Sequence, residues 1–180
     1  MDRTAAIIAA AKHFVGLTEI APNAKWDDLH TPGPDARAEE FRQALITAGW
    51  ETGWSYCIAA VEAILRQAYQ GTPQAARIAA LLNPSVMSSW HNVRAAGLDT
   101  RAAKPGSVFF MQRGNTGHGH AGIVERIEGD TLFTIEANTS PNAGTVEADR
   151  NGDGIYCKQR RLSFAYSDGL HLVGFLNPLA

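Results

Sequence analysis

The sequence has few cysteines, no strong charge imbalance and no long apolar run. Among its 180 residues are two cysteines, Cys57 and Cys157, too few for the disulfide framework that stabilises many small secreted domains. The two could pair with each other, but sequence spacing alone does not establish a disulfide. The net charge is -2 and no basic stripe is present, which argues against general nucleic-acid binding. No stretch is long and apolar enough to span a membrane, so we expect no membrane partner.

Targeting and metal-binding patterns are also missing. The N-terminal apolar run is short and is interrupted by Lys12 and His13, so we interpret it as a folded helix and not as a signal peptide. Cysteines and histidines do not show zinc spacing, and we expect neither a cofactor nor a metal. Residues 149–154 match the first half of a calcium loop. Arg160 stands at the twelfth position in place of a bidentate glutamate, which favours a turn between strands.

The hydrophobic pattern changes character near residue 97. A chain with 45% hydrophobic and 19% charged residues can build a full core, and we expect one domain over residues 1–180. Helical spacing is found in residues 4–15, 35–48, 57–69, 73–82 and 84–96. Strand-length apolar segments are found in residues 107–111, 121–127, 131–138, 155–162 and 170–176. We predict an α+β fold, with N-terminal helices packed on a C-terminal antiparallel sheet and a long loop over residues 17–34.

Cys57 stands at the predicted start of an apolar helix, directly after a turn that contains Gly53 and Trp54. Unpaired N–H groups and the helix dipole favour a thiolate at such a position, so Cys57 is a candidate nucleophile. The alternative is that Cys57 is a small apolar residue of the core, as an isolated helical cysteine usually is. The choice depends on whether the chain supplies a histidine and an orienting group.

Two histidines follow in a glycine-rich segment, residues 117–122. His120 opens a predicted strand, and the glycines beside it permit close approach of a backbone or a substrate. A neutral imidazole there could take the proton of Cys57 and later donate it to a leaving amine. His118 competes for this role, but its flanking glycines favour a loop, so we assign the base to His120.

A third polar group comes from the next predicted strand. Strand alternation places Thr134, Glu136 and Asn138 on one face. In a meander this strand is a neighbour of the strand that begins at His120. Glu136 could then orient the imidazole and stabilise its charged form, while Asn138 could orient the ring or hold substrate. The alternative is an ordinary solvent-exposed strand face.

In this order the motifs resemble those of the CHAP domain, a cysteine- and histidine-dependent amidohydrolase/peptidase family of papain-like cell-wall hydrolases. The matching segments are an N-terminal Ala-x-x-x-Val-Gly-Leu-Thr-Glu, Trp-x-x-Cys, Lys-Pro-Gly-Ser-Val-Phe-Phe, Gly-His-Ala-Gly-Ile-Val, Thr-Ile-Glu-Ala-Asn-Thr, Gly-Asp-Gly-Ile-Tyr and Val-Gly-Phe. The resemblance implies that Cys57 is the nucleophile, His120 the base, and Glu136 and Asn138 the third and fourth catalytic members. It implies peptidoglycan as substrate, cut at the sugar–peptide amide or within the stem peptide or cross-bridge.

The chain departs from the family pattern at three positions. Ser107 stands where the family usually has aspartate after Pro-Gly, and Tyr56 and Ile58 flank the thiol with more bulk than the family pattern leads us to expect. These departures bear on the shape of the cleft and on access to Cys57, and they leave the predicted fold intact.

We therefore expect a thiol hydrolase of peptidoglycan, either an N-acetylmuramoyl-L-alanine amidase or an endopeptidase. The N–H of Cys57 would stabilise the oxyanion, and Trp54, Tyr56 and His118 would bind substrate. One alternative is a non-catalytic peptidoglycan-binding module of the same fold, and another is an interbacterial toxin with the same chemistry. We expect a monomer made in the cytoplasm that acts on the cell wall after release or delivery, as a phage endolysin or a bacterial effector, with an immunity protein or inhibitor as a further partner.

Overall fold

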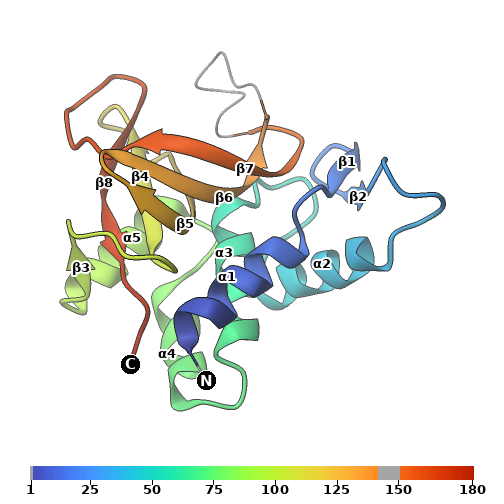
Figure 1. Ribbon diagram of the computed structural model, residues 1–180, viewed down its shortest axis with the longest axis horizontal. Coiled ribbons are helices and arrows are strands. Elements are labelled where there is room, and N and C mark those ends of the chain that lie inside the picture. The colour runs from blue at the N-terminus through green and yellow to red at the C-terminus, as the bar shows by residue number, and fades with distance from the viewer. Residues whose placement is uncertain (1, 142–150) are drawn as a thin grey trace.

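The computed structural model describes residues 2–141 and 151–180, in which helices precede an antiparallel sheet (Figure 1). The helices of these residues are α1 (Arg3–His13), α2 (Ala36–Thr47), α3 (Cys57–Ala68), α4 (Pro73–Leu81) and α5 (Val86–Ala95). The strands are β1 (Thr18–Ala21), β2 (Lys25–Asp27), β3 (Asp99–Thr100), β4 (Val108–Arg113), β5 (Gly119–Glu128), β6 (Thr131–Thr139), β7 (Gly154–Arg161) and β8 (Leu170–Leu176). The predicted α+β class is confirmed.

The eight described strands form one sheet in the order β2-β1-β7-β6-β5-β4-β8-β3. Strands β4 to β7 are neighbours in chain order, because each is joined to the next as a meander. Helix α3 buries ten of its twelve residues and contacts α1, β5 and β6, so it is the central helix of the layer below the sheet in Figure 1. A smaller apolar cluster is formed by Phe109, Val124, Leu132, Leu172 and Phe175.

The prediction of a loop over residues 17–34 is wrong. Strands β1 and β2 form a hairpin there, and β1 extends the sheet by pairing Thr18 with Gly154 of β7. An edge hairpin is held by backbone hydrogen bonds and needs few apolar side chains, which is why hydrophobic periodicity does not detect it. Its anchor is Trp26, which is buried against Phe41 and Trp50.

Three helix starts show how local chemistry sets the boundaries. Asp35 caps α2, because its side chain accepts a hydrogen bond of 2.8 Å from the backbone N–H of Arg37. Pro73 occupies the first turn of α4, where its missing N–H is tolerated. Pro84 instead precedes Ser85, the cap of α5, and lies outside the helix.

Among the residues that the structure describes, none of the helices is both long and apolar enough to cross a bilayer.

Candidate active site

Cys57 is the first residue of α3, directly after the cap residue Tyr56. Its N–H has no acceptor within the helix, because the first N–H groups of any helix lack a preceding turn. The thiol is buried, with 4% of the residue exposed. Both Cys57 and Cys157 are free thiols, and Cys157 is exposed on β7. The predicted position of Cys57 at a helix N-terminus is confirmed.

The bulky neighbours of Cys57 point into the core. Tyr56 is fully buried, with its ring centroid 5.0 Å from Trp26 and 5.9 Å from Phe41, and Ile58 is also buried. The prediction that Tyr56 binds substrate is wrong for its side chain, because a residue with 0% exposure has no surface to offer. Trp54 is 46% exposed beside the start of the helix and can still meet a substrate, so its role stays a prediction.

His120 lies between a carboxylate and a thiol. Its Nε2 is 2.9 Å from Oε2 of Glu136 on the adjacent strand β6. The other ring nitrogen, Nδ1, is buried and has no fully formed hydrogen bond within the described residues. The Cys57 thiol is nevertheless close enough to this ring to change the pKa of His120. Hydrogen bonds of this kind are often loose before substrate binds. The structure therefore brings Cys57, His120 and Glu136 together.

Glu136 is the charged centre of the site. Its Oε1 accepts hydrogen bonds from Thr134 Oγ1 (2.5 Å) and Arg160 Nε (2.9 Å), and its Oε2 accepts one from Arg160 Nη2 (2.5 Å). Burial alone would raise the pKa of this carboxyl, but the hydrogen bonds and charges of Arg160 and His120 outweigh it and hold the pKa far below its usual value. Glu136 is therefore ionised at neutral pH.

Arg160 is the residue of this site that the sequence analysis missed. It was considered there only as the residue that replaces a calcium-binding glutamate. In the structure it lies on β7, four residues beyond Tyr156, which faces Glu136 across the β6–β7 pair. Four residues along a strand return to the same face, so Arg160 and Glu136 share one side of the sheet. A buried carboxylate requires a cation, but only the strand register identifies which one.

Asn138 does not follow the strand alternation that was expected. Its φ is +58°, and the register of β6 with β7 shifts between Ala137 and Thr139. The side chain is therefore turned toward the start of α3, where Oδ1 accepts a 2.9 Å hydrogen bond from the N–H of Tyr56. Nδ2 donates to Gly152 O at 3.1 Å. The expectation that Asn138 orients the His120 ring is thus not met, because its side chain is committed to the helix start.

The glycines beside His120 permit close approach of neighbouring strands, as predicted. A Cβ at Gly122 would lie 2.8 Å from Ile135 O and 3.0 Å from Glu136 Cγ. A Cβ at Gly119 would come within 2.4 Å of Met111 O. His118 precedes β5 in an exposed loop, so its predicted contact with substrate stays untested.

The departure at Ser107 has a structural explanation. Its buried Oγ accepts a 2.9 Å hydrogen bond from the N–H of Lys104 and donates one of 2.6 Å to Oδ1 of Asn177. Ser107 therefore closes the turn before β4 against the C-terminal segment, and nothing in this contact involves Cys57 or His120.

Side chains that can ligate a metal are scattered in the described parts of the chain. Within residues 2–141 and 151–180, His, Cys, Asp and Glu side chains do not gather in groups of three or more that could hold an ion. The segment 149–154, which resembles half of a calcium loop, lies partly outside the described residues. Its last residue, Gly154, begins β7.

The charge state of His120 makes stability depend on pH. Burial opposes the charged ring and is the largest single influence, but interactions with Cys57 and Glu136 raise the pKa of His120 from 6.5 to about 9. A raised pKa stabilises the folded state below pH 6.5, and this contribution is lost as the pH rises through 9. Between pH 6 and pH 10, we expect the free energy of unfolding of wild type to fall by about 3 kcal/mol more than that of His120→Asn.

Urea unfolding of both proteins at each pH measures this difference. The comparison cancels the titration of groups that do not interact with His120, because those groups are present in both proteins. Equal losses of unfolding free energy in the two proteins would contradict the assigned charge of His120.

The central part of the chain matches one known family. A family model for the CHAP domain matches residues 47–138, slightly more than half of the chain. The matched range contains Cys57, His120 and Glu136, whereas Arg160 lies beyond it. A comparison with curated proteins found no match.

Proposed function

Because the chain belongs to the CHAP domain family, we propose that it is a thiol hydrolase that cleaves amide or peptide bonds of bacterial peptidoglycan. The observation that carries the proposal is the His120 ring, held at 2.9 Å by Glu136 on one side and facing the free thiol of Cys57 on the other. This is the nucleophile, base and orienting group that acyl transfer through a covalent intermediate requires.

The first half of the reaction forms an acyl-enzyme. The sulfur of Cys57 attacks the carbonyl carbon, and its proton resides on the imidazole of His120. The N–H of Cys57, which has no acceptor in α3, donates to the oxygen as negative charge develops there. The charged His120 then gives its proton to the departing amine, and the carbon–nitrogen bond breaks.

The second half returns the enzyme to its starting state. His120, now neutral, takes a proton from a water molecule, which attacks the thioester carbonyl. The carbon–sulfur bond breaks, the acid product leaves, and the proton returns to the Cys57–His120 pair. Glu136 keeps the same ring nitrogen engaged throughout, and its ionised state stabilises the imidazolium each time it forms.

Digestion of purified peptidoglycan tests the proposal. We expect loss of turbidity, with mass spectrometry showing one type of cleaved bond. Release of whole stem peptides from intact glycan would identify an N-acetylmuramoyl-L-alanine amidase, whereas shortened peptides still attached to sugar would identify an endopeptidase. Binding to peptidoglycan without any cleaved bond would contradict the hydrolase and indicate a non-catalytic module of the same fold.

The biological setting is a separate part of the proposal. A hydrolase of this kind made in the cytoplasm would act on the wall either in phage lysis or after delivery into a rival cell. Holin genes beside the coding sequence would indicate lysis, and an adjacent immunity gene would indicate a toxin whose inhibitor is a protein partner.

A further inference from the structure

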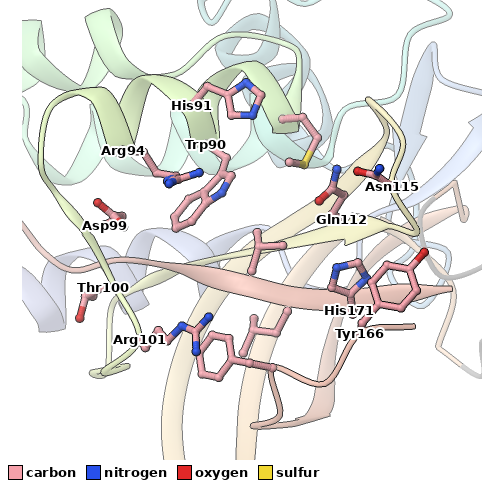
Figure 2. Close-up of a pocket in the computed structure, with 14 residues that line it drawn as sticks. Trp90, His91, Arg94, Asp99, Thr100, Arg101, Gln112, Asn115, Tyr166 and His171 are labelled. Carbon is pink, nitrogen blue, oxygen red and sulfur yellow. The ribbon is translucent and has the colours of Figure 1, made fainter. Parts of the chain in front are cut away.

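The two ends of the sheet differ in how they approach Cys57. At one end a pocket of about 700 Å³ lies between α5 and β8, and Figure 2 shows side chains of both elements around it. Its lining residue Gln112 lies opposite Gly119, the neighbour of His120, and successive residues of a strand point to opposite faces. The pocket therefore lies on the face of β5 away from His120. At the other end of the sheet, the β1–β2 hairpin contacts the segment that leads to Cys57.

The turn of this hairpin is joined to residues 53–56 at both ends of that segment. Asn23 stands in the turn, and its carbonyl oxygen accepts a 2.8 Å hydrogen bond from the N–H of Gly53. Its Oδ1 accepts a longer one, of 3.4 Å, from Nδ2 of Asn138, whose own Oδ1 holds the N–H of Tyr56. The φ of Asn23 is +44°, a left-handed conformation that asparagine tolerates better than most residues. The position of the segment therefore depends on the shape of the turn.

Glu19 of β1 holds the turn in this shape. Its Oε2 accepts a 2.9 Å hydrogen bond from the N–H of Asn23, and its own N–H donates to Asp153 O at 2.6 Å. Burial is the largest influence on the carboxyl and raises its pKa, an effect that Asp153 reinforces and that the hydrogen bonds of Asn23 and Tyr56 oppose. The two groups that offset its burial thus belong to the hairpin turn and to the residue before Cys57.

The hydroxyl of Tyr56 is the second partner of Glu19. It is buried together with Oε1 of Glu19 and the indole N–H of Trp26, and none of the three completes an aligned hydrogen bond within the described residues. The hydroxyl is still close enough to both neighbours for them to change its pKa. Burial raises that pKa well above the usual value, so the phenol keeps its proton and can donate it to the carboxylate. The far end of the ring is thus held by Glu19, while the backbone N–H of Tyr56 is held by Asn138.

This double hold on Tyr56 bears on the N–H of Cys57. The carbonyl of Tyr56 and the N–H of Cys57 belong to one planar peptide unit, so the conformation of Tyr56 sets the direction of that N–H. As the cap residue of α3, Tyr56 has a φ of -118° and a ψ of 10°. The same N–H is the donor to the oxyanion in the proposed reaction. A misplacement of about 1 Å can lower a rate about 10²-fold.

We propose that Glu19 is a positioning residue for the nucleophile: acting through Asn23 and Tyr56, its carboxylate fixes residues 53–56 and so aims the N–H of Cys57. The inference rests on the proposed hydrolase activity and adds to it a residue that acts through its neighbours and not on the substrate. An apolar side chain at position 19 would avoid the cost of burial, but it would leave the N–H of Asn23 and the hydroxyl of Tyr56 without this acceptor. The hairpin thus supports catalysis, although it contributes no reacting group.

Glu19→Ala is expected to lower kcat about 10²-fold on soluble peptidoglycan fragments, while KM changes by less than about twofold. Substrate binding is retained, whereas the oxyanion loses a well-aimed donor. Glu19→Gln keeps an oxygen that can accept from the N–H of Asn23 and should recover most of the rate. Glu51→Ala is the matched control, because it removes the same charge from an exposed residue just before Gly53 and should keep the wild-type kcat. Steady-state kinetics measure these effects, with urea unfolding to show that each variant is folded.

A reaction that forms no oxyanion distinguishes positioning from a general structural role. Iodoacetamide alkylates a thiol by forming a carbon–sulfur bond and expelling iodide, so no oxygen gains charge. In a Cys157→Ala background Cys57 is the remaining thiol. There we expect Glu19→Ala to keep the alkylation rate within about twofold of its parent while kcat falls. If alkylation and turnover fell by the same factor, Glu19 would act on the fold or on the thiol–imidazole pair, and the proposal would be overturned.

Tyr56→Phe gives an independent answer if Glu19→Ala does not fold. It keeps the buried ring, removes only the hydroxyl, and is expected to lower kcat about tenfold. In the Glu19→Ala background the same change should add nothing, since the hydroxyl acts through the carboxylate. A Tyr56→Phe protein with the wild-type kcat, or losses that add fully in the double variant, would overturn the proposal.

Amide hydrogen exchange separates this inference from the proposed function. The N–H groups of Gly53 and Tyr56 should exchange faster in Glu19→Ala than in Glu51→Ala, and equal exchange would overturn the inference. If wild type cleaves peptidoglycan and Glu19→Ala cleaves it equally well, the hydrolase stands and the positioning role fails. If wild type cleaves nothing but the two amides still exchange faster in Glu19→Ala, the proposed function fails and the hold of Glu19 on residues 53–56 stands.

Discussion

Replacing Cys57 by alanine is expected to reduce cleavage of peptidoglycan on the order of 10⁴-fold or more while the protein stays folded. The thiol is the group that would form the covalent bond to the substrate, and no neighbouring side chain in the described site can substitute for it. The change removes one sulfur atom from a position that is 4% exposed, so the packing around α3 changes little. Turbidity assays at matched protein concentration, with unfolding curves for both proteins, measure the two effects.

The second cysteine provides a matched control. Cys157→Ala removes a thiol from the exposed side of β7 and should keep the wild-type rate. An NMR titration supplies a second readout, because interaction with Cys57 is one cause of the raised pKa of His120. In Cys57→Ala that pKa should fall. The assignment of the nucleophile would be contradicted if Cys57→Ala cleaved peptidoglycan at a rate comparable to wild type. It would also be contradicted if Cys57→Ala and Cys157→Ala lost the same fraction of the wild-type rate.

Glu136→Gln is expected to lower the rate by about 10³- to 10⁴-fold and to destabilise the protein by about 3–5 kcal/mol. The amide keeps the shape of the side chain but removes the charge that both His120 and Arg160 face. Arg160, which is half-buried, then loses the carboxylate charge that its two hydrogen bonds to Glu136 engage. The pKa of His120 should fall as well, so the high-pH limit of activity should move to lower pH. Rate profiles against pH and urea unfolding measure these effects separately.

A double variant separates stability from catalysis. Arg160→Met in the Glu136→Gln background removes both the buried carboxylate and the half-buried cation, and we expect it to recover part of the lost unfolding free energy without recovering the rate. Glu128→Gln is the control, because Glu128 is exposed at the end of β5 and its pair with Arg126 contributes little. A Glu136→Gln variant that loses stability but keeps the wild-type rate and pH profile would make Glu136 a purely structural residue.

Much of the architecture was predictable because its signals are local. Apolar periodicity placed the start of α3 at Cys57 and the beginning of the main strands after residue 97, and chain order alone made β5 and β6 neighbours. From these steps follows the contact between His120 and Glu136, since residues near each other in adjacent strands of a meander can meet. The edge hairpin β1–β2 was missed because its hydrogen bonds come from the backbone and leave no apolar pattern.

The missed parts of the site depend on register and on a single backbone angle. Arg160 belongs to the site because of its position on β7 relative to Glu136, and the sequence carries no information on that register. Asn138 faces the start of α3 and not the His120 ring because a positive φ interrupts the alternation of β6, and its expected role of holding substrate stays a prediction. Tyr56 was expected to bind substrate, but its ring packs in an aromatic cluster with Trp26 of β2 and Phe41 of α2, which are distant from it in the sequence.

Strand β6 has a consequence for when the enzyme becomes active. Glu136 holds the base, and Asn138, two residues later, holds the backbone that presents the nucleophile. One short segment of β6 thus fixes the position of the base relative to the nucleophile. A newly made chain with α3 already formed but β6 not yet docked carries a thiol without a base. The reactive pair therefore exists only when the sheet is complete.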